Sequence, residues 1–276
     1  MALVDAGPVR LDYFDVGSGD PTAVLVHGAS SSARIWHSVQ ILLEQAGMRS
    51  LAIGMCRAGG SDRTTRLEDY TPSTYASDLS TALDALQVRR FVLVGHSLGV
   101  AVALEYMKDH AQESEVQALV LVAGGAGSAR AGADANQVKQ LEETLAATAS
   151  EDEGTRRALW EPNHLGLPEE VRDELWRDIL NNPRERLLGQ RMFERPDMTP
   201  TLATMSVPTP IMAGAADGTV PIEATVQGYL KLPDEQRNLH IFYGISHFPT
   251  AQVLAEVTAV MGDFIRYSVP LGTLAT

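Results

Sequence analysis

Short, continuously apolar segments alternate along the chain with longer segments whose apolar residues recur at helical spacing. The apolar segments have the length of buried strands, which are expected at residues 23–26, 50–53, 91–94, 118–122, 211–214 and 239–243, and a further strand is expected at residues 9–16, before a turn at residues 17–20. Helices are expected at residues 33–45, 72–86, 97–107, 222–230 and 250–267. Fully apolar strands that alternate with helices are typical of a mainly parallel sheet covered on both faces.

This alternation stops after a glycine-rich segment at residues 124–127. Residues 128–200 are polar and helical in pattern, and Val171, Leu175 and Ile179 share one helix face there. We therefore expect a core domain of residues 1–127 and 201–276, interrupted by a helical insertion at residues 128–200. The simplest interpretation of the insertion is a lid over the carboxyl ends of the strands, where active sites of such sheets lie.

The composition restricts the possible partners and compartment. The chain has 276 residues and a net charge of −13, which disfavours nucleic acid and anionic membranes as partners. Cys56 is the single cysteine, so no intramolecular disulfide can form. The N-terminal sequence does not resemble a signal peptide, and no apolar segment reaches the roughly 18 residues of a membrane span. We expect a cytoplasmic protein that is a monomer or a homodimer.

The most informative motif is Gly95-His96-Ser97-Leu98-Gly99, which lies between the apolar segment 91–94 and a helical pattern. A sharp turn from strand to helix with a serine at its tip exposes the hydroxyl at the edge of the sheet. The backbone of such a turn is strained, so small residues are needed two positions before and after the serine. The motif therefore predicts that Ser97 is a nucleophile.

A nucleophilic serine needs a general base, and the base needs an acid that fixes its tautomer. In enzymes with this turn the order along the chain is serine, acid, histidine. Asp217 follows the apolar segment 211–214, and His247 follows the segment 239–243. We therefore expect Ser97, Asp217 and His247 to form a catalytic triad at one edge of the sheet.

Acyl transfer also needs hydrogen-bond donors for the developing oxyanion. The backbone N–H of Leu98, at the start of a helix, is one expected donor. The second is the N–H of Ala29, in the loop after the segment 23–26. Five residues are candidates for substrate contact, either because they adjoin the catalytic loops or because they are aromatic residues of the insertion: Ser30, Val220, Phe248, Trp160 and Trp176.

Of the six histidines expected outside the triad, three lie in the motifs or the insertion. His27 ends a strand and is expected to orient its loop, and His96 is expected to be structural or to line the pocket. His164 lies in the insertion, where surface exposure is favoured over substrate contact.

Together these motifs resemble the α/β-hydrolase superfamily. The matching segments follow one another in order and cover nearly the whole chain: residues 27–29, Trp36, residues 95–99, 214–221 and 244–249. The resemblance implies an eight-stranded, mostly parallel sheet with helices on both faces and an inserted helical lid. One segment departs from the family pattern. Members commonly carry a D-x-x-G-x-G-x-S loop after the fourth strand, whereas residues 54–62 lack the leading aspartate and have closed-up glycines.

The same resemblance narrows the chemistry. Haloalkane dehalogenases and epoxide hydrolases use an aspartate nucleophile, whereas this chain has Ser97, and residues 128–200 contain no tyrosine for epoxide opening. The expected activity is hydrolysis of a small to medium, largely apolar carboxylic ester or lactone through an acyl-Ser97 intermediate. Carbon–carbon hydrolysis of a diketone and cofactor-free perhydrolysis remain alternatives on the same triad, as does a small-molecule receptor. We expect no cofactor, no metal and a small-molecule substrate as the partner.

Overall fold

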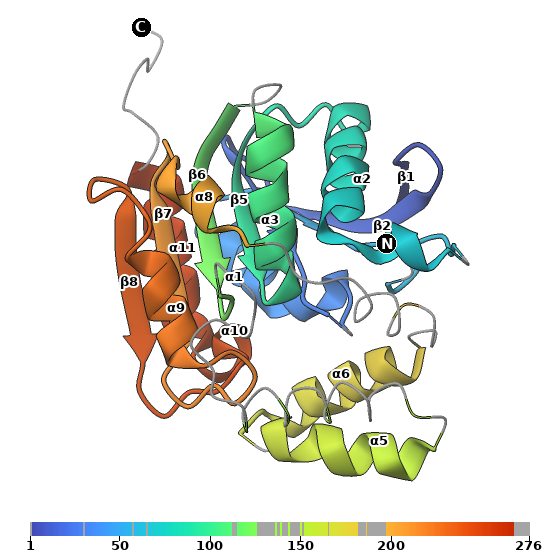
Figure 1. Cartoon of the computed structure of the whole chain (residues 1–276). Coiled ribbons are helices and arrows are strands. Elements are labelled where there is room, and N and C mark those ends of the chain that lie inside the picture. The colour runs from blue at the N-terminus through green and yellow to red at the C-terminus, as the bar shows by residue number, and fades with distance from the viewer. Residues whose placement is uncertain are drawn as a thin grey trace, which may run out of the picture.

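The computed structural model describes residues 2–29, 31–56, 58–64, 66–111, 115–125, 136, 139, 143, 150, 152–164, 166–181, 186 and 197–267. Its centre is an eight-stranded sheet in the order β1-β2-β4-β3-β5-β6-β7-β8 (Figure 1). The strands are β1 (Ala2–Asp5), β2 (Arg10–Val16), β3 (Thr22–Val26), β4 (Ser50–Ile53), β5 (Arg90–His96), β6 (Glu115–Val122), β7 (Thr209–Gly214) and β8 (Arg237–Phe242). β2 pairs antiparallel with β1 and β4, and the other neighbours pair parallel, which confirms the predicted fold class.

Helices cover both faces of the sheet (Figure 1). One face carries α1 (His37–Gln45) and α11 (Leu254–Tyr267), which contact each other. The opposite face carries α2 (Pro72–Ala85), α3 (Leu98–Asp109), α8 (Thr199–Ala203) and α9 (Ile222–Tyr229). Each face has its own apolar cluster, and the central strands β3 and β5 are buried between the two clusters. This burial on both sides explains why these strands are apolar throughout.

Between β6 and β7, two helices that the structure describes over their full length precede α8. They are α5 (Glu153–Trp160) and α6 (Glu169–Asn181), joined by the 3₁₀ helix η4 (Glu161–His164). Figure 1 places them beyond the carboxyl ends of the parallel strands. Most of residues 126–151 and 182–196 lie outside the described part of the chain. The domain boundaries at residues 127 and 200 therefore stay a prediction.

Some elements differ from the sequence-based expectation. β1 was not expected, because four residues at the edge of a sheet give little periodic signal. The helix expected at residues 33–45 begins as a 3₁₀ turn, η1 (Ala33–Trp36), and a further short helix, η2 (Leu67–Tyr70), precedes α2. The helix expected at 250–267 is divided into α10 (Pro249–Gln252) and α11, because Val253 leaves helical geometry with φ −133°.

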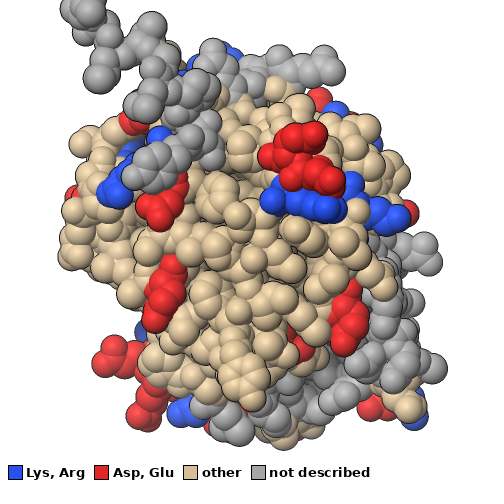
Figure 2. Space-filling model, turned by 90° about the vertical axis from the view of Figure 1, so that its left-hand side faces the viewer, with Lys and Arg blue, Asp and Glu red and all other residues tan. Residues whose placement is uncertain are grey.

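β8 forms one edge of the sheet, and exposed apolar side chains gather around it. Ile241 on β8 is 47% exposed, Tyr243 just after it is 95% exposed, and Leu230 after α9 is 59% exposed. Figure 2 shows that charged side chains are sparse at the centre of this face and lie mostly toward its rim. This edge of the sheet is therefore an unusually apolar part of the surface.

The loop after β4 explains how the chain tolerates its departure from the superfamily pattern. Gly54 stands at the position where the pattern has aspartate, but Asp12 of β2 reaches into the same space. A Cβ atom built on Gly54 would lie 1.8 Å from Oδ1 of Asp12. The fully buried Asp12 carboxylate accepts the N–H of Gly60 at 2.9 Å and the hydroxyl of Ser61 at 3.0 Å. A neighbouring strand thus supplies the carboxylate that holds this loop.

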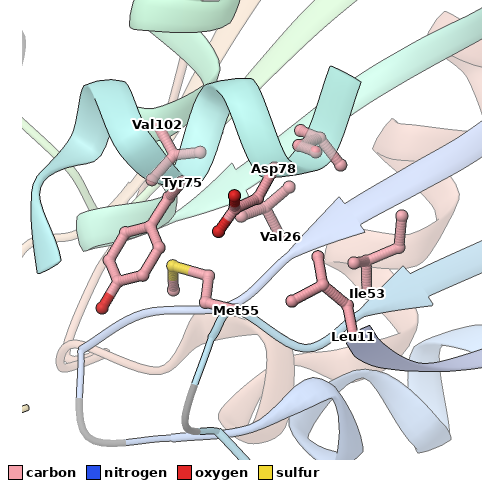
Figure 3. Close-up of a pocket in the computed structure, with 8 residues that line it drawn as sticks. Leu11, Val26, Ile53, Met55, Tyr75, Asp78 and Val102 are labelled. Atoms are coloured by element: carbon pink, nitrogen blue, oxygen red, sulfur yellow. The ribbon is translucent and has the colours of Figure 1, made fainter. Parts of the chain in front are cut away.

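A small apolar cavity lies between the sheet and the helices α2 and α3 (Figure 3). Its volume is about 10 Å³, and it is lined by Leu11, Val26, Ile53, Met55, Tyr75, Asp78, Leu79 and Val102. Asp78 of α2 is only 7% exposed, and no described residue forms a hydrogen bond with its carboxylate. Burial, together with the negative charge of Asp69, raises the pKa of Asp78 to about 7.

This carboxyl group is expected to make stability depend on pH. The folded chain binds the Asp78 proton more tightly than the unfolded chain, so stability is lost as the pH rises from about 4 to about 7. Between pH 5 and pH 8 the loss at this site is about 2–3 kcal/mol. Asp78→Asn is expected to remove that dependence on pH. Denaturant unfolding at pH 5 and at pH 8 should show that the variant is more stable than the wild type at pH 8.

Asp84→Asn is the matched control, because Asp84 lies on the same helix with its side chain 55% exposed and paired to Arg89. The control variant should keep the wild-type dependence on pH. An Asp78→Asn variant that loses as much stability between pH 5 and pH 8 as the wild type would contradict this account.

Candidate active site

Ser97 occupies the tip of a strained turn between β5 and α3. Its backbone has φ 54° and ψ −114°, a conformation that side-chain-bearing residues rarely adopt. The N–H of Ser97 donates to the carbonyl of Val122 at 2.9 Å, which ties the turn to the end of β6. The structure therefore places the serine at the carboxyl edge of the sheet in the geometry that the sequence predicted.

The two glycines of the motif are required by close backbone contacts. A Cβ atom on Gly95 would lie 2.3 Å from the carbonyl oxygen of Gly99. A Cβ atom on Gly99 would lie 2.4 Å from the carbonyl oxygen of Val26. Any larger residue at either position would force β3, β5 and α3 apart, so the turn can form only with this spacing.

Asp217 and His247 come together from the loops after β7 and β8. Nδ1 of His247 donates to Oδ2 of Asp217 at 2.8 Å, and the other carboxylate oxygen accepts the N–H groups of Thr219 and Val220 at 2.8 and 2.9 Å. The side chain of Asp217 is 1% exposed. Burial alone would raise the pKa of Asp217, but the charge of His247 and these hydrogen bonds hold it below its usual value. The carboxylate of Asp217 is thus ionised and holds the ring of His247 in place.

The two loops meet because β7 ends in a glycine. A Cβ atom on Gly214 would lie 2.2 Å from the carbonyl oxygens of Ile245 and Ser246. Ala216 also donates its N–H to the carbonyl of Ile245 at 2.8 Å. This direct backbone packing holds the segment before His247 against the segment before Asp217.

The loop after β3 lies directly against the serine turn. A Cβ atom on Gly28 would lie 3.0 Å from Cβ of Ser97, so only glycine lets the two backbones approach this closely. His27 holds the loop: its Nε2 accepts the N–H of Met55 at 3.0 Å, so its proton is on Nδ1, which donates to the carbonyl of Gly28 at 2.7 Å. Ala29 follows in this loop, as expected for an oxyanion donor.

Leu98, the other expected donor, is the first residue of α3. The first N–H groups of a helix have no partner within the helix and point toward negative charge. The structure describes the positions of Leu98 and Ala29, and their role in binding an oxyanion stays a prediction.

The amino-acid sequence of the chain is similar to those of known proteins. A family model described as the alpha/beta hydrolase fold matches residues 21–248. The chain belongs to this family. It is 27% identical over 93% of its length to an uncharacterized protein of Mycobacterium tuberculosis, of which the match covers 79%.

Solved structures of other α/β hydrolases share the fold at low identity. A thermophilic esterase from Thermogutta terrifontis is 22% identical, with a TM-score of 0.81 and coverage of 97% of this chain and 98% of that one. A bromoperoxidase from Bacillus anthracis is 21% identical, also with a TM-score of 0.81, and covers 96% and 98%. At this identity the similarity establishes the shared fold and does not choose between the two activities.

His96, the second residue of the hydrolase motif, connects the serine turn to the base. It is 1% exposed, and burial and the nearby His247 lower its pKa to about 3, so it is neutral. Its Nε2 therefore donates to the carbonyl oxygen of His247 at 2.9 Å. The rings of His96 and His247 are 5.1 Å apart. The structure thus assigns His96 the structural role that was expected.

The proposed substrate contacts fall into two groups. Val220 is 3% exposed and braces Asp217 through its N–H, and Phe248 directly follows the base. Trp160 and Trp176, from α5 and α6, pack 5.2 Å apart in one apolar cluster with Phe248. Ser30 lies outside the described residues. Substrate contact by any of the five stays a prediction.

Sequence reasoning missed two residues that connect the insertion to the loop after β3. The guanidinium of Arg186 is fully buried and donates to the carbonyl of Ser31 at 3.3 Å. Asp178 of α6 accepts the hydroxyl of Ser32 at 2.6 Å, and burial raises its pKa. A charged residue in a polar helical segment carries no sign that it will be buried. The contacts arise only when these residues pack against the loop after β3.

In the part of the chain that the structure describes, no group of three or more His, Cys, Asp or Glu side chains could hold a metal ion. Within the same residues, no helix is both long and apolar enough to cross a membrane.

Proposed function

We propose that the chain hydrolyses carboxylic esters or lactones of small to medium, largely apolar molecules through an acyl-Ser97 intermediate. The observation that carries this proposal is the 2.8 Å hydrogen bond between His247 and the buried carboxylate of Asp217, at the sheet edge where Ser97 ends β5. A carboxylate on Nδ1 leaves Nε2 of His247 free of a proton and able to accept one from a serine hydroxyl.

The reaction follows from these roles. Ser97 attacks the ester carbonyl while His247 takes its proton, and the N–H groups of Ala29 and Leu98 receive the developing oxyanion. His247 then returns the proton to the leaving alcohol, which departs as the acyl-serine forms. A water molecule, deprotonated by His247, releases the acid and restores Ser97. In a lactone the leaving alcohol stays attached to the product.

The inserted helices supply the apolar side of the proposed pocket. Trp160, Trp176 and Phe248 form a buried cluster where α5 and α6 meet the segment after His247. An apolar wall beside a polar catalytic centre is the usual composition of a small-molecule site. This arrangement supports an uncharged, largely apolar substrate.

A fluorophosphonate probe tests the proposal, because it reacts only with an activated serine in an accessible site. We expect the probe to label Ser97, as located by mass spectrometry, and labelling to be slowed by an ester or lactone that the protein hydrolyses. Esters, lactones, diketones and an ester with hydrogen peroxide should be compared in the same series. Absence of labelling, or turnover of diketones alone, would overturn the assignment to ester hydrolysis.

A further inference from the structure

His164 is a polar side chain within the apolar wall that α5 and α6 present to the core. The cluster consists of buried apolar residues: Trp160, Leu167, Leu175, Trp176, Ile179 and Phe248. His164, at the end of η4, lies among them, with its ring centre 4.1 Å from that of Trp160 and 5.1 Å from that of Phe248. A polar group in such surroundings is costly unless it finds a hydrogen-bond partner.

Its hydrogen bond fixes the tautomer of His164. Nδ1 lies 2.6 Å from the carbonyl oxygen of Trp160, and a carbonyl can only accept, so Nδ1 carries a proton. Burial and the nearby His247 lower the pKa of His164 to about 4, and the ring is therefore neutral near pH 7. Nε2 of His164 is consequently an unprotonated acceptor.

That acceptor has no partner within the described part of the chain. No hydrogen bond joins Nε2 of His164 to another described residue, and the atom is not among the polar atoms sealed from solvent. The ring cannot easily turn away, because it stacks on Trp160 with 15° between the planes and its Nδ1 is already bonded. His164 therefore holds a fixed lone pair open to a ligand.

The ring of His164 lies close to the candidate active site. The ring of Phe248 lies 5.1 Å from His164 and 5.3 Å from His247. A single aromatic ring thus separates the two histidines. A substrate whose carbonyl lies at Ser97 would extend along Phe248 toward His164.

We propose that Nε2 of His164 accepts a hydrogen bond from the substrate, and that the preferred substrates are esters or lactones bearing a hydroxyl or amide N–H group a few bonds from the carbonyl. This inference rests on the proposed hydrolysis by Ser97 and names the substrate class within it. A substrate without the donor leaves the His164 acceptor unpaired in the complex, so it is selected against.

Matched pairs of substrates test the inference. One pair is methyl 3-hydroxybutanoate and methyl 3-methoxybutanoate, and the other is 2-acetamido-γ-butyrolactone and its N-methyl derivative. In each pair a methyl group replaces the donor hydrogen, and the comparison with His164→Phe separates the lost hydrogen bond from the added volume. For the full-length protein we expect kcat/KM to favour the donor member of at least one pair by about tenfold, the size of one buried hydrogen bond.

Three variants complete the design. His164→Phe keeps the stacking ring but has no acceptor, and should bring the kcat/KM ratio of the favoured pair close to one. His164→Gln offers an amide oxygen and should restore part of the preference. His110→Phe is the control, because His110 lies after the far end of α3 and packs beside Tyr106, and it should leave the ratio unchanged.

The outcomes separate this inference from the proposed function. Suppose that Ser97→Ala abolishes hydrolysis, but that His164→Phe leaves the kcat/KM ratio of the substrate pair unchanged. This result overturns the role of His164 and leaves the esterase proposal standing. A wild-type ratio near one in both pairs does the same. Hydrolysis that persists in Ser97→Ala overturns the proposed function, and the inference about His164 falls with it.

Discussion

Replacing Ser97 by alanine is expected to lower kcat for ester hydrolysis by about 10⁴–10⁶-fold, to the rate that binding and the oxyanion donors alone support. The hydroxyl of Ser97 is the group that the proposed mechanism uses to form the acyl intermediate. Alanine keeps the Cβ atom and fits the same backbone, so the turn at φ 54° should be preserved. Steady-state kinetics of the purified variant measures the loss.

Ser77→Ala is the matched control, because Ser77 is an exposed serine of α2 outside the proposed site. It should retain the wild-type kcat. Both variants should unfold at the wild-type temperature, since neither change creates a cavity in the core. A Ser97→Ala variant with more than about 1% of wild-type kcat would show that another group is the nucleophile.

The catalytic edge could be predicted because its signals are local in the sequence. The turn at Ser97 requires small residues at two fixed positions, and the apolar strand that precedes it is equally plain. Asp217 and His247 were found because each follows the end of a strand, and parallel strands end at the same edge of a sheet. The structure adds the 2.8 Å contact that joins them.

Contacts between distant segments could not be predicted in this way. Asp12 and Ser61 are 49 residues apart, and Arg186 and Ser31 are 155 residues apart. A pattern of apolar and polar positions shows which face of an element is buried, but it does not show which polar group crosses to another element. The sequence therefore shows only that Gly54 stands in place of the aspartate of the family pattern, and the structure shows that Asp12 supplies the carboxylate.

The apolar cluster of α5, α6 and Phe248 was only partly predictable for the same reason. Trp160 and Trp176 stand out as aromatic residues in a polar segment, and the structure brings both against Phe248. His164 carried no comparable sign, and exposure was expected for it. Its burial and its bond to the carbonyl of Trp160 depend on how η4 joins α5 to α6. Which polar group lies within this apolar cluster depends on packing that one sequence does not specify.

Asp217→Asn is expected to lower kcat by about 10⁴-fold while leaving the fold intact, because the change reverses a single hydrogen bond. One carboxylate oxygen of Asp217 accepts the N–H groups of Thr219 and Val220, and an asparagine must keep its carbonyl oxygen there. Its NH₂ group then faces Nδ1 of His247. Since NH₂ can only donate, Nδ1 must accept, and the His247 proton moves to Nε2. A protonated Nε2 cannot accept the proton of Ser97.

Asp234→Asn is the control for this prediction, because the side chain of Asp234 is 80% exposed and pairs only at the surface with Arg237. It should change kcat by less than twofold. The thermal unfolding of Asp217→Asn should stay close to that of the wild type, since asparagine fills the same volume. A loss of kcat below about tenfold would mean that the tautomer of His247 is fixed by some group other than Asp217, and the 2.8 Å contact would then be structural.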